Sequence, residues 1–314
     1  MVDNRKQWKA WLYLSPALLL LLVFTVWPII NTVRMSMLVD YNGLKAVAGA
    51  TFDFGFGNFL KVIKYKRFLQ CLKNTVLLCV LTVPISTILA LLIAVALNSI
   101  KWLQKGLQTI FFLPYVTNSI AIGMVFAAMF NIVGSFYGTE NEIVVTAGIV
   151  NNIIQMFGGK HINWINYGSS YAANMAVLVI YIVWNALPFK ILVLLGGLQS
   201  INKQYYDAAK VDGTPRRRVF TRITVPLLSP MLAYVIITGF IGGFKEYSSI
   251  VGIFGETMGP ANEAGRLNTM VGFVYDALEL GNEGRASAAA LILFFIILAV
   301  TLFNNKVIKK HVHY

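Results

Sequence analysis

Long apolar runs alternate along the chain with short polar segments, and this pattern predicts helices that span a membrane. A helix needs about 20 apolar residues to cross roughly 30 Å of hydrocarbon. The first run follows a basic start, but it is too long for a signal peptide and lacks a small-x-small cleavage site, so we interpret it as a retained span. The runs that meet the length are at about 11–33, 74–97, 107–132, 171–198, 226–254 and 286–303. We therefore predict an all-α polytopic membrane protein with six transmembrane helices, in which residues 1–314 form one transmembrane domain.

Composition agrees with this prediction and excludes several other classes of protein. Hydrophobic residues make up 57% of the chain and charged residues only 12%, whereas soluble domains carry about 25% charged residues. Such a chain is neither an ordinary soluble enzyme nor a disordered linker. Cys71 and Cys79 are the two cysteines, and eight helical residues separate them by about 12 Å. That distance excludes a disulfide, so we read both as buried small apolar residues.

The distribution of charge orients the spans. An even number of spans places both termini on one side, and we assign that side to the cytoplasm. The inner segments then hold 14 Lys and Arg and 3 acids, and the outer segments hold 10 and 9. The excess of +13 thus divides into +11 inside, +1 outside and +1 from Lys190, Lys245 and Glu246 within the spans, in keeping with the positive-inside rule. Basic residues at span ends argue against nucleic-acid binding. A basic and apolar cluster at 59–69 fits an interfacial amphipathic helix on the outer side.

The inner segment 199–225 has the pattern of two short helices. Asn202 is a suitable N-cap, and Gly213 suits the position after a helix where left-handed backbone is needed. Thr214-Pro215 then predicts the N-cap and first residue of a second helix, which carries four arginines on one side and Phe220 and Ile223 on the other. Two interpretations stay open: the arginines are only topological anchors, or the two helices form a knob that a soluble partner binds.

The same segment resembles a known family. Asp207-Ala208-Ala209, Gly213, Ile223 and Val225-Pro226 resemble the EAA loop of ABC importer membrane subunits, whose pattern is E-A-A-x(3)-G-x(9)-I-x-L-P. Asp207 and Val225 depart from it conservatively. Further stretches resemble the carbohydrate branch of the maltose and glycerol-phosphate type: Leu12-Tyr13-Leu14-Ser15-Pro16-Ala17, Asn163-Trp164, Gly259-Pro260 with Asn262, and the alanines Ala286, Ala288, Ala289 and Ala290. The outer stretch at about 134–148 looks inserted relative to shorter members.

The resemblance implies a type I permease that works with other subunits in the cell membrane of a prokaryote. The implied partners are a second related permease, two ATP-binding subunits, an extracytoplasmic substrate-binding protein and a carbohydrate substrate. The residues implied in coupling to the ATP-binding subunits are Asp207, Ala208, Ala209, Gly213, Phe220, Ile223 and Pro226. The chain has no G-x-x-x-x-G-K-[ST] motif, so we expect ATP and Mg to be used by the partner subunits. We expect no catalytic residues, cofactor or metal in this chain.

Polar and aromatic groups within the fourth and fifth runs predict a substrate path. Polar groups inside a membrane are costly and usually face a cavity or a partner, and aromatic rings beside amides and charges suit sugars. The residues predicted from this pattern are Tyr181, Trp184, Asn185, Phe189, Lys245, Glu246 and Tyr247, and motif position in the resemblance adds Ala186. A place in the aromatic belt that faces lipid, or helix packing, is the alternative for the aromatic residues, and a structural pair with a partner subunit is the alternative for Lys245 and Glu246. At the level of function, the alternative is an ion-coupled secondary transporter of a small polar solute.

Overall fold

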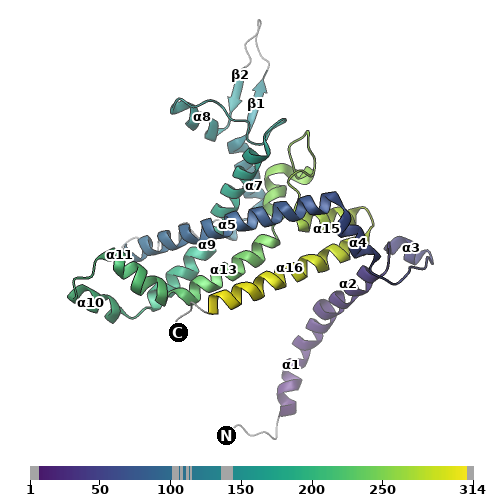
Figure 1. Cartoon of the computed structure of the whole chain (residues 1–314), viewed down its shortest axis with the longest axis horizontal. Coiled ribbons are helices and arrows are strands. Elements are labelled where there is room, and N and C mark those ends of the chain that lie inside the picture. Colours follow the sequence, from purple (N-terminus) through teal and green to yellow (C-terminus); the bar gives the residue numbers. More distant parts are fainter. Residues whose placement is uncertain are drawn as a thin grey trace. The chain divides into compact units, whose positions relative to one another are not determined.

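The computed structural model describes residues 7–100, 106, 109–110, 113, 115–135 and 144–309 of the chain. These residues are helical almost throughout, as predicted, and they include one short hairpin (Figure 1). The hairpin pairs β1 (Ile132–Ser135) antiparallel with β2 (Val144–Ala147). It falls in the outer stretch that the sequence marks as an insertion, of which 136–143 lie outside the described residues. The all-α fold class is confirmed.

The described chain divides into two compact units. The first takes in the residues up to Leu69 together with Met270–Phe295. Its elements are α1 (Gln7–Leu21), a π-helical turn η2 (Leu22–Val26), α2 (Trp27–Met37), α3 (Gly43–Val47), α4 (Gly57–Lys64), α15 (Met270–Glu279) and the starts of α5 and α16.

Buried amides and surface ion pairs fix the loops of the first unit. Asn58 donates from Nδ2 to the carbonyl of Ser36 at 3.0 Å and accepts from the backbone N–H of Asp40 at 3.0 Å. Because a buried polar group is costly without a partner, these bonds define the turn between α2 and α4. The outer basic cluster does contain a helix, α4, and Arg67 beyond it pairs with Asp276 at 3.3 Å.

The second unit covers Gln70–Thr269 and the end of α16, and it carries both predicted functional regions. Its helices are α5 (Lys66–Ser99, from Gln70), α7 (Ser119–Phe130), α8 (Ile149–Met156), α9 (Tyr171–Ser200), α10 (Lys203–Val211), α11 (Arg216–Val219), η3 (Phe220–Thr224), α12 (Val225–Leu227), α13 (Ser229–Phe244), α14 (Ser248–Phe254), η4 (Gly255–Thr257) and the later part of α16 (Glu283–Lys309).

Four of the predicted spans are continuous helices in the described residues. They are Trp8–Met37, Lys66–Ser99, Tyr171–Ser200 and Glu283–Val307, which correspond to the first, second, fourth and sixth apolar runs. Each is long and apolar enough to cross a bilayer. Part of the third run, 107–132, lies outside the described residues, and its later half is α7, with 12 residues. The count of six and the side of the termini stay predictions.

The fifth predicted span, 226–254, is not one straight helix. The run Arg216–Leu227 meets Ser229–Phe244 at a bend of 66°, and counting that pair as one gives up to five spans among the described residues. Pro230 has no N–H to continue the helical bonding at this bend. The helix then breaks again after Phe244, and α14 begins at Ser248. The Glu246 carboxylate accepts the N–H of Ser249 at 3.1 Å, so it satisfies a free donor of the new helix.

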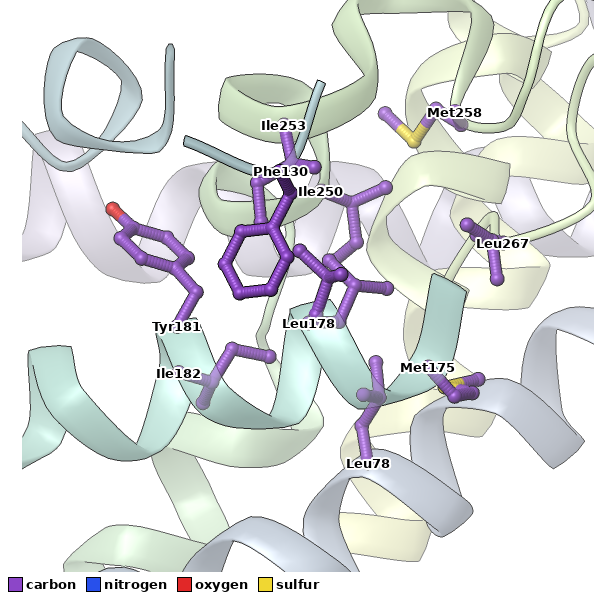
Figure 2. Packing of buried hydrophobic residues seen from close by; sticks show 11 residues of the cluster. Leu78, Phe130, Met175, Leu178, Tyr181, Ile182, Ile250, Ile253, Met258 and Leu267 are labelled. Carbon is purple, nitrogen blue, oxygen red and sulfur yellow. The ribbon is translucent and has the colours of Figure 1, made fainter. Parts of the chain in front are cut away.

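A cluster of almost fully buried side chains holds α5, α7, α9 and α14 together (Figure 2). Its members are Leu78, Phe130, Met175, Val177, Leu178, Tyr181, Ile182, Ile250, Ile253, Met258 and Leu267. Beside it the backbones of α7 and α14 touch, since a Cβ placed on Gly123 would lie 2.7 Å from the Cα of Gly252. Glycine at both positions permits this approach, as small residues do between membrane helices.

Glycine also lines the boundary between α5 and α13. A Cβ on Gly243 would lie 2.8 Å from the Sγ of Cys79, and a Cβ on Gly239 would lie 3.2 Å from a methyl group of Val83. Cys79 is fully buried there, and both cysteines are free, as predicted. The helices α9 and α13 also pack against each other, so α13 contacts both α5 and α9, two long helices of this unit.

Candidate functional site

A cavity of about 270 Å³ lies between α5, α9 and α13. Polar and aromatic side chains come into its wall from each of these helices and from the segment before α7. The wall comprises Thr82, Val83, Ser86, Tyr115, Ile182, Asn185, Ala186, Phe189, Lys190, Thr238, Gly239, Gly242, Gly243 and Glu246. A mostly apolar hollow with a few polar groups is the usual form of a small-molecule site.

Lys190 is the cation of this cavity wall. Its side chain is buried, and its ammonium donates to Ser86 Oγ at 2.7 Å, Thr87 Oγ1 at 2.9 Å and the carbonyl of Val83 at 3.2 Å. An ammonium has three donors, so these acceptors on α5 use all of them. Lys190 therefore joins α9 to α5 and has no donor left over for a ligand in this arrangement.

Aromatic rings form a second part of the wall. Tyr115 and Phe189 stack with their planes 19° apart and their centroids 5.9 Å apart. The ring of Phe189 also packs against that of Tyr234 of α13, with the ring centroids 6.3 Å apart. Stacked rings present a flat apolar surface, and the amide of Asn185 lies in the same wall. Such a combination can accept the C–H face of a sugar while the amide binds its hydroxyls.

The structure brings together four of the eight predicted substrate-path residues. Asn185, Ala186, Phe189 and Glu246 all line the cavity. Glu246 belongs to the break between α13 and α14, and its backbone carbonyl accepts a hydrogen bond from Thr269 at 2.8 Å. The broken helix thus places a carboxylate at the cavity where a continuous helix was predicted.

The other four lie elsewhere. Tyr181 is fully buried in the core and donates its hydroxyl to the backbone carbonyl of Ser119. Trp184 packs on Phe126 with the ring centroids 5.2 Å apart, and Tyr247 packs against the buried cluster that contains Tyr181. Lys245 caps the end of α13 with its side chain exposed, and it is absent from the cavity wall.

Sequence reasoning missed the α5 side of the cavity. Thr82 and Ser86 are spaced by four residues, so one face of the second span carries both hydroxyls, but nothing in the sequence pairs that face with Lys190. Lys190 itself had a signal, because it is a charged residue within an apolar run. Among the described residues, no group of His, Cys, Asp or Glu could hold a metal ion.

The segment 199–225 forms the predicted pair of helices. The side chain of Asn202 accepts the N–H of Gln204 at 3.0 Å and caps α10. At the other end Gly213 has φ +64°, with N–H bonds from Gly213 to Lys210 at 3.1 Å and from Thr214 to Ala209 at 2.9 Å. These two bonds define a Schellman ending, which the glycine makes possible.

The second helix of this segment differs slightly from the prediction. Pro215 occupies the N-cap position rather than the first helical position. A π-helical turn, η3, connects α11 to α12, so Phe220 and Ile223 lie in η3 while Pro226 lies within α12. The hydroxyl of Tyr206 contacts that of Thr224 at 3.3 Å and ties the two helices together.

The two helices enclose a shallow hollow of about 400 Å³. Its wall comprises Asn202, Gln204, Tyr205, Ala208, Ala209, Asp212, Thr214 and Ile223. Of the predicted coupling residues, Ala208, Ala209 and Ile223 therefore lie together at this hollow. Asp207 is exposed and pairs with Lys210 at 3.5 Å, an exposed pair that contributes little to stability.

Comparison with known proteins supports one class of function for this arrangement. Residues 82–311 match the family described as binding-protein-dependent transport system inner membrane component. The chain is 30% identical over 296 residues to the lactose transport system permease protein LacF of Rhizobium radiobacter, covering 94% of this chain and 91% of that protein. It is 28% identical over 297 residues to the trehalose/maltose transport system permease protein MalF of Thermococcus litoralis, covering 95% and 92%.

A solved structure shares the fold. One chain of a bacterial ABC transporter involved in the import of the acidic polysaccharide alginate aligns with a TM-score of 0.76 at 20% identity. The alignment covers 98% of this chain and 97% of that one.

Proposed function

This chain belongs to the family of binding-protein-dependent transport system inner membrane components, and on that premise we propose that it is a membrane-spanning subunit of an ATP-driven sugar importer. The observation that carries the proposal is the match across residues 82–311, which includes both the cavity and the paired helices of 199–225. Its relatives over almost the whole chain are named as permeases for lactose and for trehalose and maltose.

The substrate that best suits the cavity is a neutral disaccharide or short oligosaccharide. Phe189 and Tyr115 offer a stacked aromatic face, and Asn185 and Glu246 offer hydrogen-bonding groups. The ammonium of Lys190 is already bonded to three oxygens of α5, and Lys245 lies off the cavity wall. Among the described lining residues, no cation therefore has a donor to spare for an acidic sugar.

The paired helices of 199–225 are the surface that we assign to an ATP-binding subunit. Tyr205 and Val211 are large apolar side chains with 54% and 88% exposure, and four arginines stand on the helices that follow. Exposed apolar groups beside a shallow hollow suit a protein partner. Tyr206 and Gly213 fix the arrangement of the two helices. A movement of the partner bound at the hollow would therefore be transmitted to α13 through η3 and α12.

The whole assembly in this proposal contains a second related permease, two ATP-binding subunits and an extracytoplasmic substrate-binding protein. The test is uptake of labelled disaccharides into vesicles that contain this chain with its partner subunits. ATP inside the vesicle and binding protein outside should both be required. Uptake driven by a proton or sodium gradient without ATP would contradict the proposal and favour an ion-coupled transporter.

A point variant separates the coupling surface from the substrate path. Asp207→Lys reverses a charge at the exposed edge of α10 without touching the cavity, and it should abolish co-purification of the ATP-binding subunits while membrane insertion stays intact. Lys203→Asp is a matched control with a charge reversal at the start of the same helix. Normal co-purification of the Asp207 variant would refute the assigned role.

A further inference from the structure

The helix α8, between the outer strand β2 and the start of α9, presents an apolar stripe that nothing in the described residues covers. Ile149, Ile153, Met156 and Phe157 are 58%, 49%, 84% and 89% exposed. Their spacing of four, seven and eight residues from the first puts all four on one face of the helix. The helix itself contains no charged residue.

The opposite face of α8 is fixed to the protein by Asn151. This side chain is fully buried, donates from Nδ2 to the carbonyl of Ile162 at 3.0 Å and accepts the N–H of Ile162 at 3.1 Å. Its oxygen also accepts the indole N–H of Trp164 at 3.2 Å. Three hydrogen bonds of one buried amide fix the rotation of α8 about its own axis. The apolar stripe, on the opposite face, therefore points away from the protein.

Asparagine contacts also fix where α8 lies relative to the membrane helices of its unit. Asn166 donates to the side chain of Asn131, which ends α7, and accepts the N–H of Ile132, which begins β1, at 3.0 Å. Asn174, in the first turn of α9, donates to the carbonyl of Trp164 at 2.7 Å. The segment that carries α8 is thus tied to the outer ends of two apolar helices.

The start of α8 lies directly against α7. Gly148 donates its N–H to the carbonyl of Asn131 at 2.8 Å, and a Cβ placed on Gly148 would lie 2.4 Å from the carbonyl oxygen of Met129. Although the hairpin of β1 and β2 separates them in the chain, the last turn of α7 and the first turn of α8 are in direct contact in space. The stripe therefore lies beside the end of α7 and, through the contact of Asn174 with Trp164, close to the start of α9, which is long and apolar enough to cross a bilayer.

We propose that α8 lies in the plane of the outer membrane interface, with its apolar stripe embedded at the boundary between lipid headgroups and acyl chains. An uncharged helix with one strongly apolar face is suited to this depth. The flanking side chains agree with it, since Tyr167 is 75% exposed and Lys160 follows the helix after two glycines. Tyrosine is enriched at membrane interfaces, and Lys160 is exposed, as a residue that meets lipid phosphates would be. The proposal depends on the chain being a membrane protein and not on its substrate.

The test is the accessibility of spin labels on α8 in lipid vesicles. Single cysteines replace Met156 or Ile153 in the full chain with Cys71→Ala and Cys79→Ala, and Gln155→Cys is the matched control because Gln155 is exposed on the other side of the helix. Oxygen partitions into lipid and a nickel chelate stays in water. The ratio of oxygen to nickel accessibility should be at least fivefold higher at positions 156 and 153 than at 155.

Each other outcome overturns the proposal. Equally low ratios at 155 and 156 would place the stripe in water, and equally high ratios would place the whole helix in the hydrocarbon rather than at the interface. Labels at 156 that become shielded from both reagents only when binding protein is added would assign the stripe to that soluble partner. Shielding from both reagents that appears only with the second permease would assign it to the subunit interface. Labelling the chain alone and with its co-purified subunits distinguishes a failure of this proposal from a failure of the proposed transport activity.

Discussion

The contact between Lys190 and α5 allows a quantitative prediction, because its charged donor and its neutral acceptors can be removed separately. The ammonium binds Ser86, Thr87 and the carbonyl of Val83. Hydrogen bonds between membrane helices contribute about 0.6 kcal/mol each on average and about 1.7 at most, so three contribute about 2 kcal/mol. A lysine at the centre of a membrane helix costs about 2.5–3.5 kcal/mol on insertion scales. The two terms nearly cancel.

Lys190→Met should therefore change the free energy of unfolding by no more than about 1 kcal/mol, since methionine keeps the unbranched shape and most of the length of the side chain and removes both terms together. The hydroxyls of Ser86 and Thr87 stay satisfied in this variant, because each also donates to a carbonyl of its own helix, that of Thr82 for Ser86 and that of Val83 for Thr87.

The combined variant Ser86→Ala with Thr87→Val should behave differently. It leaves the ammonium buried with one acceptor, at a cost of about 1–3 kcal/mol, because a buried donor that has lost its partner costs about that much. Adding Lys190→Met to it should restore stability, which gives a coupling energy of the same size. Unfolding in mixed micelles with increasing dodecyl sulfate measures all four chains. A loss above about 3 kcal/mol in Lys190→Met, or no loss in the hydroxyl variant, would show that these three hydrogen bonds do not balance the cost of burying the ammonium.

Further variants test the coupling loop, the cavity and the glycine contact. Gly213→Val places a β-branched residue at φ +64°, which costs about 1–2 kcal/mol, and should reduce the ATP-binding subunits recovered with the purified chain. Phe189→Ala should raise the sugar concentration for half-maximal uptake about tenfold, equivalent to about 1.4 kcal/mol of lost binding, whereas Lys245→Ala should leave it unchanged. Gly123→Val should lower stability by about 1–3 kcal/mol in the micelle assay through overpacking, with Gly242→Ala, which has open space beside it, unaffected.

The sequence predicted the features that depend on local chemistry. The cap at Asn202 and the left-handed turn at Gly213 were both predicted. A short amide side chain can accept a free N–H at the start of a helix, and a residue without Cβ can adopt left-handed backbone at its end. Long apolar runs predicted four of the continuous helices, because the length of an apolar run is likewise read directly from neighbouring residues. The roles assigned to the coupling and substrate-path residues stay predictions.

Features that depend on contacts distant in sequence were not predictable. The break at Lys245 to Tyr247 is stabilised by Thr269, which lies more than twenty residues away. The fifth run carries the charged pair Lys245 and Glu246, but one continuous helix could carry both, so its pattern alone indicates one helix. The cavity wall likewise depends on α5 hydroxyls that meet Lys190 only after the helices pack. Periodicity shows which side of a helix is polar but not which helix it faces.

The glycine boundary between α5 and α13 also makes Cys79 a natural probe of helix movement. Its thiol is fully buried against Gly243 and contacts the backbone carbonyl of Phe240 at 3.7 Å. A maleimide can reach this sulfur only after α13 has separated from α5. In a Cys71→Ala chain, in which Cys79 is the one cysteine left, the rate of alkylation therefore counts openings of that boundary, and comparing the rates with and without ATP would time the movement at a native side chain.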